Sequence, residues 1–403
     1  MLQEMTPFFA PLLFLLGAVV GSFLNVCIAR LPSGKSVVFP SSHCPVCQKP
    51  IRWFDNIPLF SYCLLGAKCR DCKTRISIRY FLVEFLTALM FLGTFYLLGL
   101  APILFPVLVW EGLLIVATFV DFEHRIIPDE LSLWGIPAGI LLSFLLPGLQ
   151  LDRAMAGPVV GWAVSLLLVS FCALLMLSSA WMKRRSLSIE ERRILLGGYG
   201  VVLLQYGILF LASWDQTRAD AWSSLAASLE GGVIGGAALL ALGLLGEVLI
   251  RKRIVTPFDL ETITGEKDRL FKALQSAGYL DEGGEVQKKF SLLKKAQDLE
   301  LPPEWGEIRE KIYEVIVSCV DGGVMGGGDV KLMALVGVFI GWELALLAII
   351  IAPFLGAPVG IIEKIRTKSS ALAFGPYLAM GSLIAFFWGH QIIRSYMGLF
   401  PNL

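Results

Sequence analysis

Two Cys-x2-Cys pairs carry the strongest chemical signal in this sequence. They are CPVC at 44–47 and CRDC at 69–72, with 21 residues between them. Each pair directs two thiolates toward one point, and two pairs at this spacing predict a tetrahedral zinc site. The predicted ligands are Cys44, Cys47, Cys69 and Cys72. Four thiolates leave no coordination position for water, so we expect the zinc to be structural rather than catalytic.

Two aspartates stand at the ends of apolar runs, where carboxylates are costly and functional by default. Asp121 closes the run in IVATFVDFEHRIIPDELS, and Asp329 opens the run in VMGGGDVKLMALVGVFIGW. If the two side chains pack together they cannot readily hold two charges, so they share one proton. Such a dyad activates water and polarises a peptide carbonyl, which is the chemistry of an aspartic protease. The alternative is that each aspartate is a solvated or helix-capping residue.

Three consecutive glycines precede Asp329, and a lysine follows it two residues later. Without Cβ atoms, Gly326 and Gly328 would let an extended substrate backbone come within hydrogen-bonding distance of Asp329. We expect Lys331 to tune the aspartate or to bind a carboxylate of the substrate. Gly326, Gly328 and Lys331 are therefore the predicted substrate-binding residues.

The elements that carry these residues are predicted to be membrane helices. The chain has 403 residues, of which 56% are hydrophobic and 17% charged, and its mean hydropathy is +0.71. The apolar residues come in blocks of roughly 20, long enough to cross about 30 Å of hydrocarbon. This favours an all-α, polytopic transmembrane helical bundle over a soluble all-helical protein. The net charge of +1 gives no support for nucleic-acid binding.

Ten apolar runs are predicted to span the bilayer. They lie near residues 7–29, 80–99, 102–121, 132–149, 156–181, 194–213, 224–250, 330–350, 351–362 and 372–396. The first run has no small-residue cleavage site, so we read it as a retained helix. Lys and Arg concentrate in the loops of one side, which predicts that the cysteines and both aspartates face the cytoplasm. A reducing cytoplasm favours zinc over disulfides at the cysteines.

Residues 253–316 differ in kind, because their apolar residues form stripes at helical spacing. They predict a small cytoplasmic helical insert that is solvated or binds a partner, and we find no catalytic signal in it. The chain is thus predicted to have six parts. These are a first span at 1–30, the zinc loop at 31–79, helices with the first catalytic aspartate at 80–150, additional helices at 151–250, the insert at 251–319 and the second-aspartate helices at 320–403.

Six stretches, in order, resemble the type IV prepilin peptidase family, whose members combine a leader peptidase with an N-methyltransferase. They are GSFLNVCIARLP at 21–32, CPVC with CRDC, FDNIPLFSYCLLGAKCRDCKTRISIRYFLVEFLTAL at 54–89, DFEHRIIPD at 121–129, MGGGDVKLMALVGVFIG at 325–341 and FGPYLAMG at 374–381. A lone G-x-G-D would be a weak signal, whereas the six together are a strong one. The resemblance covers residues 1–150 and 320–390.

The resemblance implies an intramembrane aspartic peptidase of the bacterial inner membrane, with Asp121 and Asp329 as its catalytic pair. It implies removal of the leader of type IV prepilins and pseudopilins, as in pilus assembly and type II secretion, after a glycine on the cytoplasmic side. Methylation of the new N-terminal residue would follow, with S-adenosylmethionine as donor, and the cysteine loop and its zinc are tied to that step. No glycine-rich loop follows a predicted strand, so we expect the donor to be held outside a Rossmann unit.

One departure from the family concerns the chain between the two aspartates. The family usually has two spans there, whereas four spans and the insert are predicted in this chain. We expect 156–181 and 194–213 to form an added hairpin, with 224–250 belonging to the family core. Two alternatives stay open: a peptidase without methyl transfer, and a transporter whose aspartates relay protons. A four-thiolate metal loop has no evident use in a transporter, which disfavours the second.

Overall fold

The computed structural model of the chain describes most of the predicted helices. It covers residues 2–146, 164–174, 176, 189–214, 219–249, 267–280, 282, 298–302, 305, 308–313, 316, 326–367 and 373–399. Much of the predicted span 156–181 and of the predicted insert 253–316 therefore lies outside the described residues. Within them the secondary structure is helical, with two isolated β-bridges and no strand.

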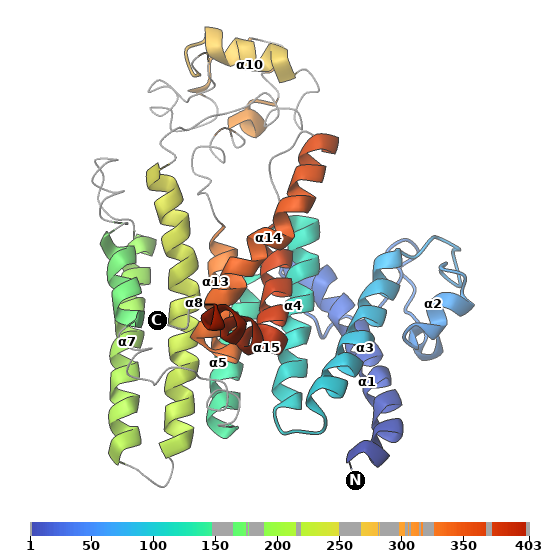
Figure 1. Cartoon of the computed structure of the whole chain (residues 1–403). Coiled ribbons are helices and arrows are strands. Elements are labelled where there is room, and N and C mark those ends of the chain that lie inside the picture. The colour runs from blue at the N-terminus through green and yellow to red at the C-terminus, as the bar shows by residue number, and fades with distance from the viewer. Residues whose placement is uncertain are drawn as a thin grey trace.

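The helices form a bundle in which most axes run roughly side by side (Figure 1). In chain order they are α1 Leu2–Arg30, η1 Leu31–Ser33, η2 Trp53–Asn56, α2 Phe60–Leu64, α3 Ile78–Leu98, α4 Leu104–His124, α5 Asp129–Leu145, α7 Ile189–Trp214, α8 Ala219–Leu249, α10 Lys267–Ser276, α13 Gly327–Ile340, α14 Trp342–Thr367 and α15 Gly375–Gly398. The predicted all-α class is confirmed for this part of the chain.

Five of the described helical segments are long and apolar enough to cross a membrane. They are Pro7–Ser33, Ile78–Leu98, Leu104–His124, Asp220–Leu245 and Trp342–Glu363. Large apolar side chains on their outer faces are exposed, as on α1, where Phe8, Leu15 and Phe23 are more than half exposed. Such faces suit lipid rather than water, because a soluble monomer rarely exposes contiguous apolar surface of this extent. The chain is therefore a polytopic membrane protein.

The division of the apolar run after Asp329 differs from the prediction. Spans at 330–350 and 351–362 were expected, but the break falls at Gly341, between α13 and α14. Gly341 has φ 82° and ψ 167°, a conformation that favours glycine, so the chain turns there although its hydropathy is continuous. The 14 residues of α13 rise only about 21 Å, less than the roughly 30 Å of hydrocarbon. The predicted boundary at 350 is wrong because hydropathy records composition and not backbone turns.

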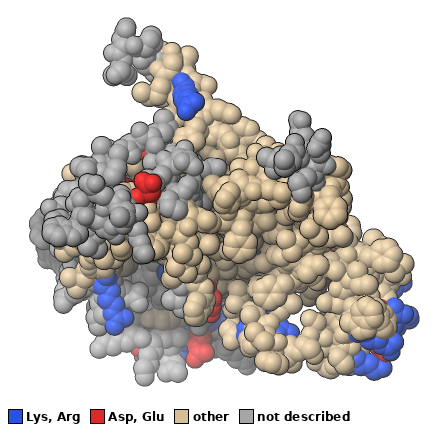
Figure 2. Space-filling model, turned by 90° about the horizontal axis from the view of Figure 1, so that it is seen from below, with Lys and Arg blue, Asp and Glu red and all other residues tan. Residues whose placement is uncertain are grey.

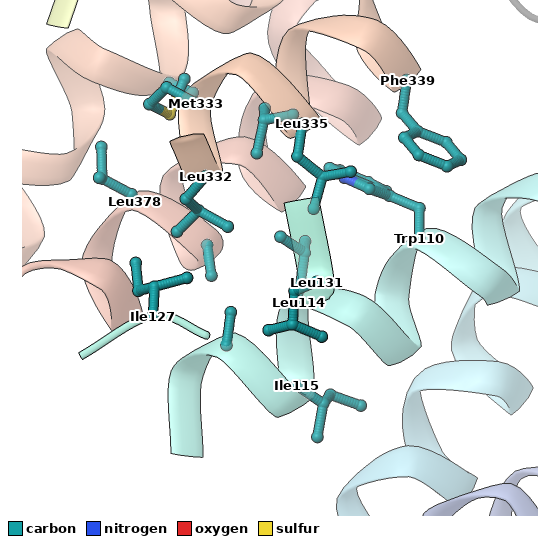
Figure 3. Close-up of a cluster of buried hydrophobic side chains, with 14 of the residues drawn as sticks. Trp110, Leu114, Ile115, Ile127, Leu131, Leu332, Met333, Leu335, Phe339 and Leu378 are labelled. Atoms are coloured by element: carbon teal, nitrogen blue, oxygen red, sulfur yellow. The ribbon is translucent and has the colours of Figure 1, made fainter. Parts of the chain in front are cut away.

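The centre of the bundle is formed by α4, α13 and α15. Trp110 of α4 is fully buried, and its ring centroid lies 6.4 Å from that of Phe339 and 5.4 Å from that of Phe386. Figure 3 shows the α4 and α13 side chains, with Leu114 and Leu335 among them, meeting across this centre. Since lipid tails are as apolar as leucine, this packing stabilises the bundle through close van der Waals contact rather than through removal from water.

Helix α8 packs backbone to backbone against α13. A Cβ added to Gly231 would lie 1.9 Å from the carbonyl oxygen of Gly337, and one added to Gly337 would lie 1.8 Å from that of Gly231. Glycines allow this approach, as in other closely packed membrane helices. Ser228 Oγ donates a hydrogen bond of 3.0 Å to the carbonyl oxygen of Val338, one of the last four carbonyls of α13, which have no partner within the helix itself.

The two helices of the predicted extra region differ in their packing. Helix α8 packs against α5, α13 and α14, whereas α7 packs mainly against α8 at the edge of the bundle. This is the arrangement expected when 194–213 belongs to an added hairpin and 224–250 to the core, although most of the other half of that hairpin lies outside the described residues.

The described part of the predicted insert has a hydrophobic core of its own. Its fully buried side chains include Leu270, Leu274, Tyr279 and Ile312, and Trp305 packs against them. The hydroxyl of Tyr279 accepts a 2.8 Å hydrogen bond from the backbone N–H of Glu300. The apolar stripe expected at 305–316 is thus used within the insert, which lies at one end of the bundle (Figure 1).

The contact between α8 and α13 generates the first testable prediction. Gly231→Ala places a methyl group against the Gly337 backbone, and overpacking of this kind costs about 1–3 kcal/mol. We expect a lower thermal unfolding midpoint of the purified protein in detergent. Gly207→Ala in α7 is the matched control, because no described residue lies within 4 Å of its added methyl. Equal midpoints for the two variants would contradict the close approach.

Candidate functional site

Asp121 lies in the last turn of α4, at the end of the bundle that carries the insert. Its side chain is buried, and its Oδ2 accepts a 2.9 Å hydrogen bond from the backbone N–H of Gly375. Gly375 begins α15, and the first N–H groups of a helix have no partner within it. The N-terminus of α15 therefore binds the Asp121 carboxylate, a location that also favours negative charge.

Asp329 lies in the first turn of α13, half-buried, and close enough to Asp121 for their charges to interact. The segment that joins α4 to α5 packs against the N-termini of α13 and α15. It begins at Arg125, whose left-handed conformation (φ 55°) ends α4. It then brings Ile127 against both Gly328 and Gly375, where added Cβ atoms would lie 3.0 and 3.3 Å from Ile127 atoms.

The structure thus brings together the two predicted catalytic residues, which are 208 positions apart in the sequence. Each sits at a helix end, and the ends belong to helices of the buried core. Two carboxylates so placed favour a state in which one is protonated, because two negative charges in a partly buried site repel each other. Such a pair can act on a bound water molecule and a carbonyl group.

The predicted substrate-binding residues lie at the same end but have different surroundings. Gly326 is exposed, and among the described residues the one neighbour within 4 Å of a Cβ added there would be Asp329 Oδ2 at 3.6 Å. Gly328 instead packs against Ile127. Lys331 is exposed and forms an ion pair with Asp129, at the start of α5. The geometry therefore leaves Gly326 open beside the aspartate, whereas Gly328 serves packing and Lys331 is joined to a different acid.

Gly375 and Ile127 are not among the predicted site residues, although both fall inside stretches that carry the family resemblance. Gly375 lies in FGPYLAMG and Ile127 in DFEHRIIPD. A Cβ added to Gly375 would lie 2.8 Å from Asp121 Oδ2, so the carboxylate needs a glycine there. A glycine followed by proline at the start of an apolar helix was the available signal, because it marks an open helix N-terminus.

The four predicted metal ligands form a second cluster. The sulfurs of Cys44, Cys47, Cys69 and Cys72 all lie within 4.8 Å of one another, and those of Cys44 and Cys72 are 3.7 Å apart. Sulfurs bound tetrahedrally to zinc at about 2.3 Å would be about 3.8 Å apart. The cluster therefore fits a four-coordinate zinc without rearrangement of the chain.

Each half of the cluster is a tight turn with the same hydrogen bonds. Cys44 N–H donates to Lys49 O (3.0 Å) and Gln48 N–H to Cys44 O (2.9 Å). In the second turn, Cys69 N–H donates to Thr74 O (2.8 Å) and Lys73 N–H to Cys69 O (3.1 Å). Hydrogen bonds to the side chain and backbone of Thr74 lower the pKa of Cys72 to about 6, which favours the thiolate that a metal binds.

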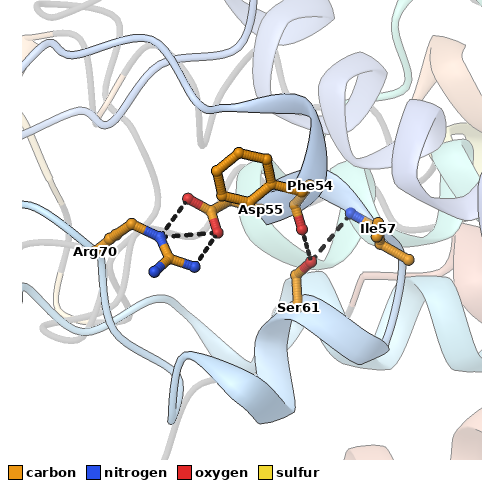
Figure 4. Close-up of polar contacts among 5 residues, drawn as sticks. All are labelled: Phe54, Asp55, Ile57, Ser61 and Arg70. Atoms are coloured by element: carbon orange, nitrogen blue, oxygen red, sulfur yellow. Dashed lines mark hydrogen bonds and ion pairs between the residues drawn. The ribbon is translucent and has the colours of Figure 1, made fainter.

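Polar contacts fasten the cysteine turns to the rest of the loop. Arg70 Nε lies 2.8 Å from Asp55 Oδ2, and its Nη2 lies 2.6 Å from Asp55 Oδ1 (Figure 4). This bidentate guanidinium lowers the pKa of Asp55. Ser61 Oγ donates to Phe54 O at 2.9 Å and accepts from Ile57 N–H at 3.1 Å. The segment from η2 to α2 is therefore fixed to the second cysteine turn.

Comparisons with known proteins identify the family of the chain. Residues 15–98 match the bacterial peptidase A24 N-terminal domain, and residues 311–361 match the type IV leader peptidase family. The prepilin leader peptidase/N-methyltransferase of Neisseria gonorrhoeae is 35% identical over 198 residues, which are 43% of this chain and 69% of the relative. The chain belongs to the type IV leader peptidase family. Within this family match Asp329 lies in the second segment, and Asp121 lies between the two segments.

Other relatives support membership of the leader peptidase family. The prepilin leader peptidase/N-methyltransferase of Myxococcus xanthus is 38% identical over 240 residues, 60% of this chain and 66% of the relative. The type 4 prepilin-like proteins leader peptide-processing enzyme of Escherichia coli is 37% identical over 172 residues, 36% of this chain and 61% of the relative. The aligned parts thus span about two thirds of these relatives. No solved structure matches the chain.

The cysteine cluster predicts bound zinc that depends on all four ligands. Cys69→Ser should reduce the zinc content of the purified protein, measured by elemental analysis, from about one ion per chain to much less than one. Cys63→Ser is the matched control, since Cys63 is an exposed cysteine of the same loop outside the cluster. Zinc retained by Cys69→Ser, or lost equally from both variants, would contradict the assignment of these ligands.

The hydrogen bond from Gly375 N–H to Asp121 predicts that a side chain at position 375 of α15 would reduce activity. Gly375→Ala would push the Asp121 carboxylate from its site, and misplacement of a catalytic group by about 1 Å can cost a hundredfold in rate. We expect that loss in the leader cleavage for which the relatives are named. In the same helix, Gly398→Ala has no residue of the described ranges within 4 Å of its added methyl and should cleave normally. Unchanged cleavage by Gly375→Ala would show that Asp121 does not need this position.

Proposed function

We propose that this chain is a membrane aspartic endopeptidase that removes the leader of type IV prepilins and pseudopilins. It cleaves after a glycine on the cytoplasmic side and methylates the new N-terminal residue with S-adenosylmethionine. The names of the relatives support both activities, and the matched family supports the peptidase. The observation that carries the peptidase assignment is the meeting of Asp121 and Asp329 at one end of the bundle.

The mechanism follows from a dyad that holds one proton. The ionised carboxylate accepts a proton from water while the water oxygen attacks the carbonyl carbon of the scissile peptide. The protonated carboxyl donates its hydrogen to the carbonyl oxygen, which forms a neutral tetrahedral intermediate. Collapse of the intermediate breaks the C–N bond. The amine leaves with a proton from the protonated carboxyl, and a hydroxyl of the intermediate returns its proton to the other carboxylate, which restores the dyad. The open surroundings of Gly326 support its role as the point where the substrate backbone approaches Asp329.

The cysteine loop supports the methyl-transfer part of the proposal through its fold. A zinc ion bound by Cys44, Cys47, Cys69 and Cys72 would hold the two turns together and take no direct part in the reaction. When bound, S-adenosylmethionine supplies the methyl group. The described residues contain no strand, so a donor bound among them would contact the loop and helix ends rather than a Rossmann unit.

Location and partners follow from the same assignment. We propose a multi-pass protein of the bacterial inner membrane, with the dyad and the zinc loop at the cytoplasmic face. Its partners would be prepilins or pseudopilins and membrane lipid, with no nucleic acid. The six-part division at 1–30, 31–79, 80–150, 151–250, 251–319 and 320–403 assigns peptidase chemistry to the third and sixth parts and zinc binding to the second.

Co-expression with one prepilin tests the proposal. Asp329→Asn removes one carboxylate while keeping the side-chain volume, so leader removal should fall about a hundredfold or more, read from the mass of the pilin. Glu130→Gln is the control: it changes an exposed acid in the first turn of α5 and should leave cleavage intact. Full processing by Asp329→Asn would falsify the dyad. In the wild type, a processed pilin heavier by one methyl group supports methyl transfer, and its absence refutes it.

A further inference from the structure

The loop between α1 and α3 exposes large apolar side chains although it lies outside the spanning helices. Trp53 is 80% exposed, Leu64 71% and Phe60 61%. Phe60 and Leu64 are four residues apart on α2 and therefore share one face of it. The opposite face of α2 carries Tyr62, whose ring packs on Phe81 of α3 with centroids 5.5 Å apart. One side of α2 is thus fixed to the bundle, and the other presents apolar surface.

The attachment of α2 fixes its level along α3. The polar end of α3 is marked by Arg79, which forms an ion pair with Glu123 at the end of α4. The backbone N–H of Leu59 donates a 2.7 Å hydrogen bond to Glu84 Oε2. Glu84 lies about 7.5 Å farther along the helix than Arg79 at the α-helical rise. Figure 1 accordingly shows α2 beside α3 rather than beyond its end. In a bilayer whose headgroups begin near Arg79, this level would lie at the boundary between headgroups and acyl chains.

The same loop is strongly basic. Residues 31–79 contain eight Lys or Arg side chains and two acidic ones. Five of the basic residues are exposed and form no ion pair among the described residues: Lys35, Arg52, Lys68, Lys73 and Arg75. Seen along the bundle from the end opposite α10, basic side chains gather at the side where the loop projects (Figure 2). They therefore include groups directed toward the membrane that surrounds the bundle.

We propose that the segment Trp53–Leu64 is an interfacial membrane anchor that binds anionic phospholipid. Trp53, Phe60 and Leu64 enter the headgroup–acyl boundary, where tryptophan is favoured and amphipathic elements bury their apolar face by roughly 5–10 Å. The basic side chains bind the lipid phosphates, with about 1 kcal/mol per Lys or Arg near an anionic surface. A basic prepilin leader fits less well, because eight cations would repel it. The anchor does not depend on the proposed peptidase activity.

The anchor would set the position of the metal cluster. Asp55 lies within it and forms the bidentate pair with Arg70, which stands between the ligands Cys69 and Cys72. Lipid contact would therefore hold the cysteine turns close to the membrane surface, at the same end of the bundle as the aspartates. A loop without the anchor would be attached to the helices through α2 and its two covalent ends.

Quenching of tryptophan fluorescence tests the apolar part of this proposal. The full-length protein is reconstituted into phosphatidylcholine–phosphatidylglycerol vesicles with bromines either near the headgroup or near the chain ends. The difference between wild type and Trp53→Phe isolates the Trp53 emission, which headgroup-proximal bromines should quench more strongly. Trp305→Phe is the control, because Trp305 is buried in the insert and its emission should respond to neither lipid. If neither brominated lipid quenches the Trp53 emission, the proposal of a membrane anchor is wrong.

A second variant tests the charge. The triple variant Arg52→Gln, Lys68→Gln, Lys73→Gln should retain its zinc and lose the increase in Trp53 quenching that phosphatidylglycerol adds over phosphatidylcholine alone. Equal quenching of wild type and triple variant in both lipids overturns the lipid-phosphate contact. A shift of Trp53 emission on adding a prepilin leader peptide in detergent, without any bromine quenching, would instead assign this surface to the substrate and overturn the proposal.

Discussion

The close approach of the Asp121 and Asp329 carboxylates at one end of the bundle is the constraint on which the rest of the structure depends. Two acidic groups in a partly buried site repel each other unless one is protonated or each has its own donors. Here the N-terminus of α15 provides Asp121 with a donor, and Asp329 stands in the first turn of α13. Three helix termini must therefore meet, and Ile127 fills the space between two of them. Any shift of α13 or α15 changes the distance between the carboxylates.

The position of α13 depends on α8 more than on its own length. A helix of 14 residues cannot fix its depth by spanning the hydrocarbon, so its neighbours must do so. The close approach of Gly231 and Gly337 and the bond from Ser228 to Val338 provide this support near the turn at Gly341. The insert between α8 and α13 folds around its own core, which allows a long connection without disturbance of their contact. The number of residues between Asp121 and Asp329 therefore does not determine how close their side chains lie in the structure.

The parts of this arrangement that depend on local sequence could be predicted. The long spans, the cysteine ligands and the two aspartates follow from hydropathy, spacing and the cost of charge in a membrane. The turn at Gly341 could not be predicted in this way, because one glycine with positive φ does not change the hydropathy of an apolar run. The bond from Gly375 to Asp121 joins residues 254 positions apart, and the packing of Gly328 on Ile127 depends on the path of another segment. Such contacts depend on tertiary structure, which periodicity and spacing do not describe.

The two clusters share one end of the bundle, and this proximity gives the proposed pair of reactions a physical order. Arg79 at the start of α3 contacts Glu123, two residues after Asp121, so the helix that follows the zinc loop is joined to the helix that carries the dyad. A substrate cut at the dyad leaves its new amine at this level of the membrane. A loop anchored at the lipid boundary would meet the amine at that depth, whereas a loop extended into water would not.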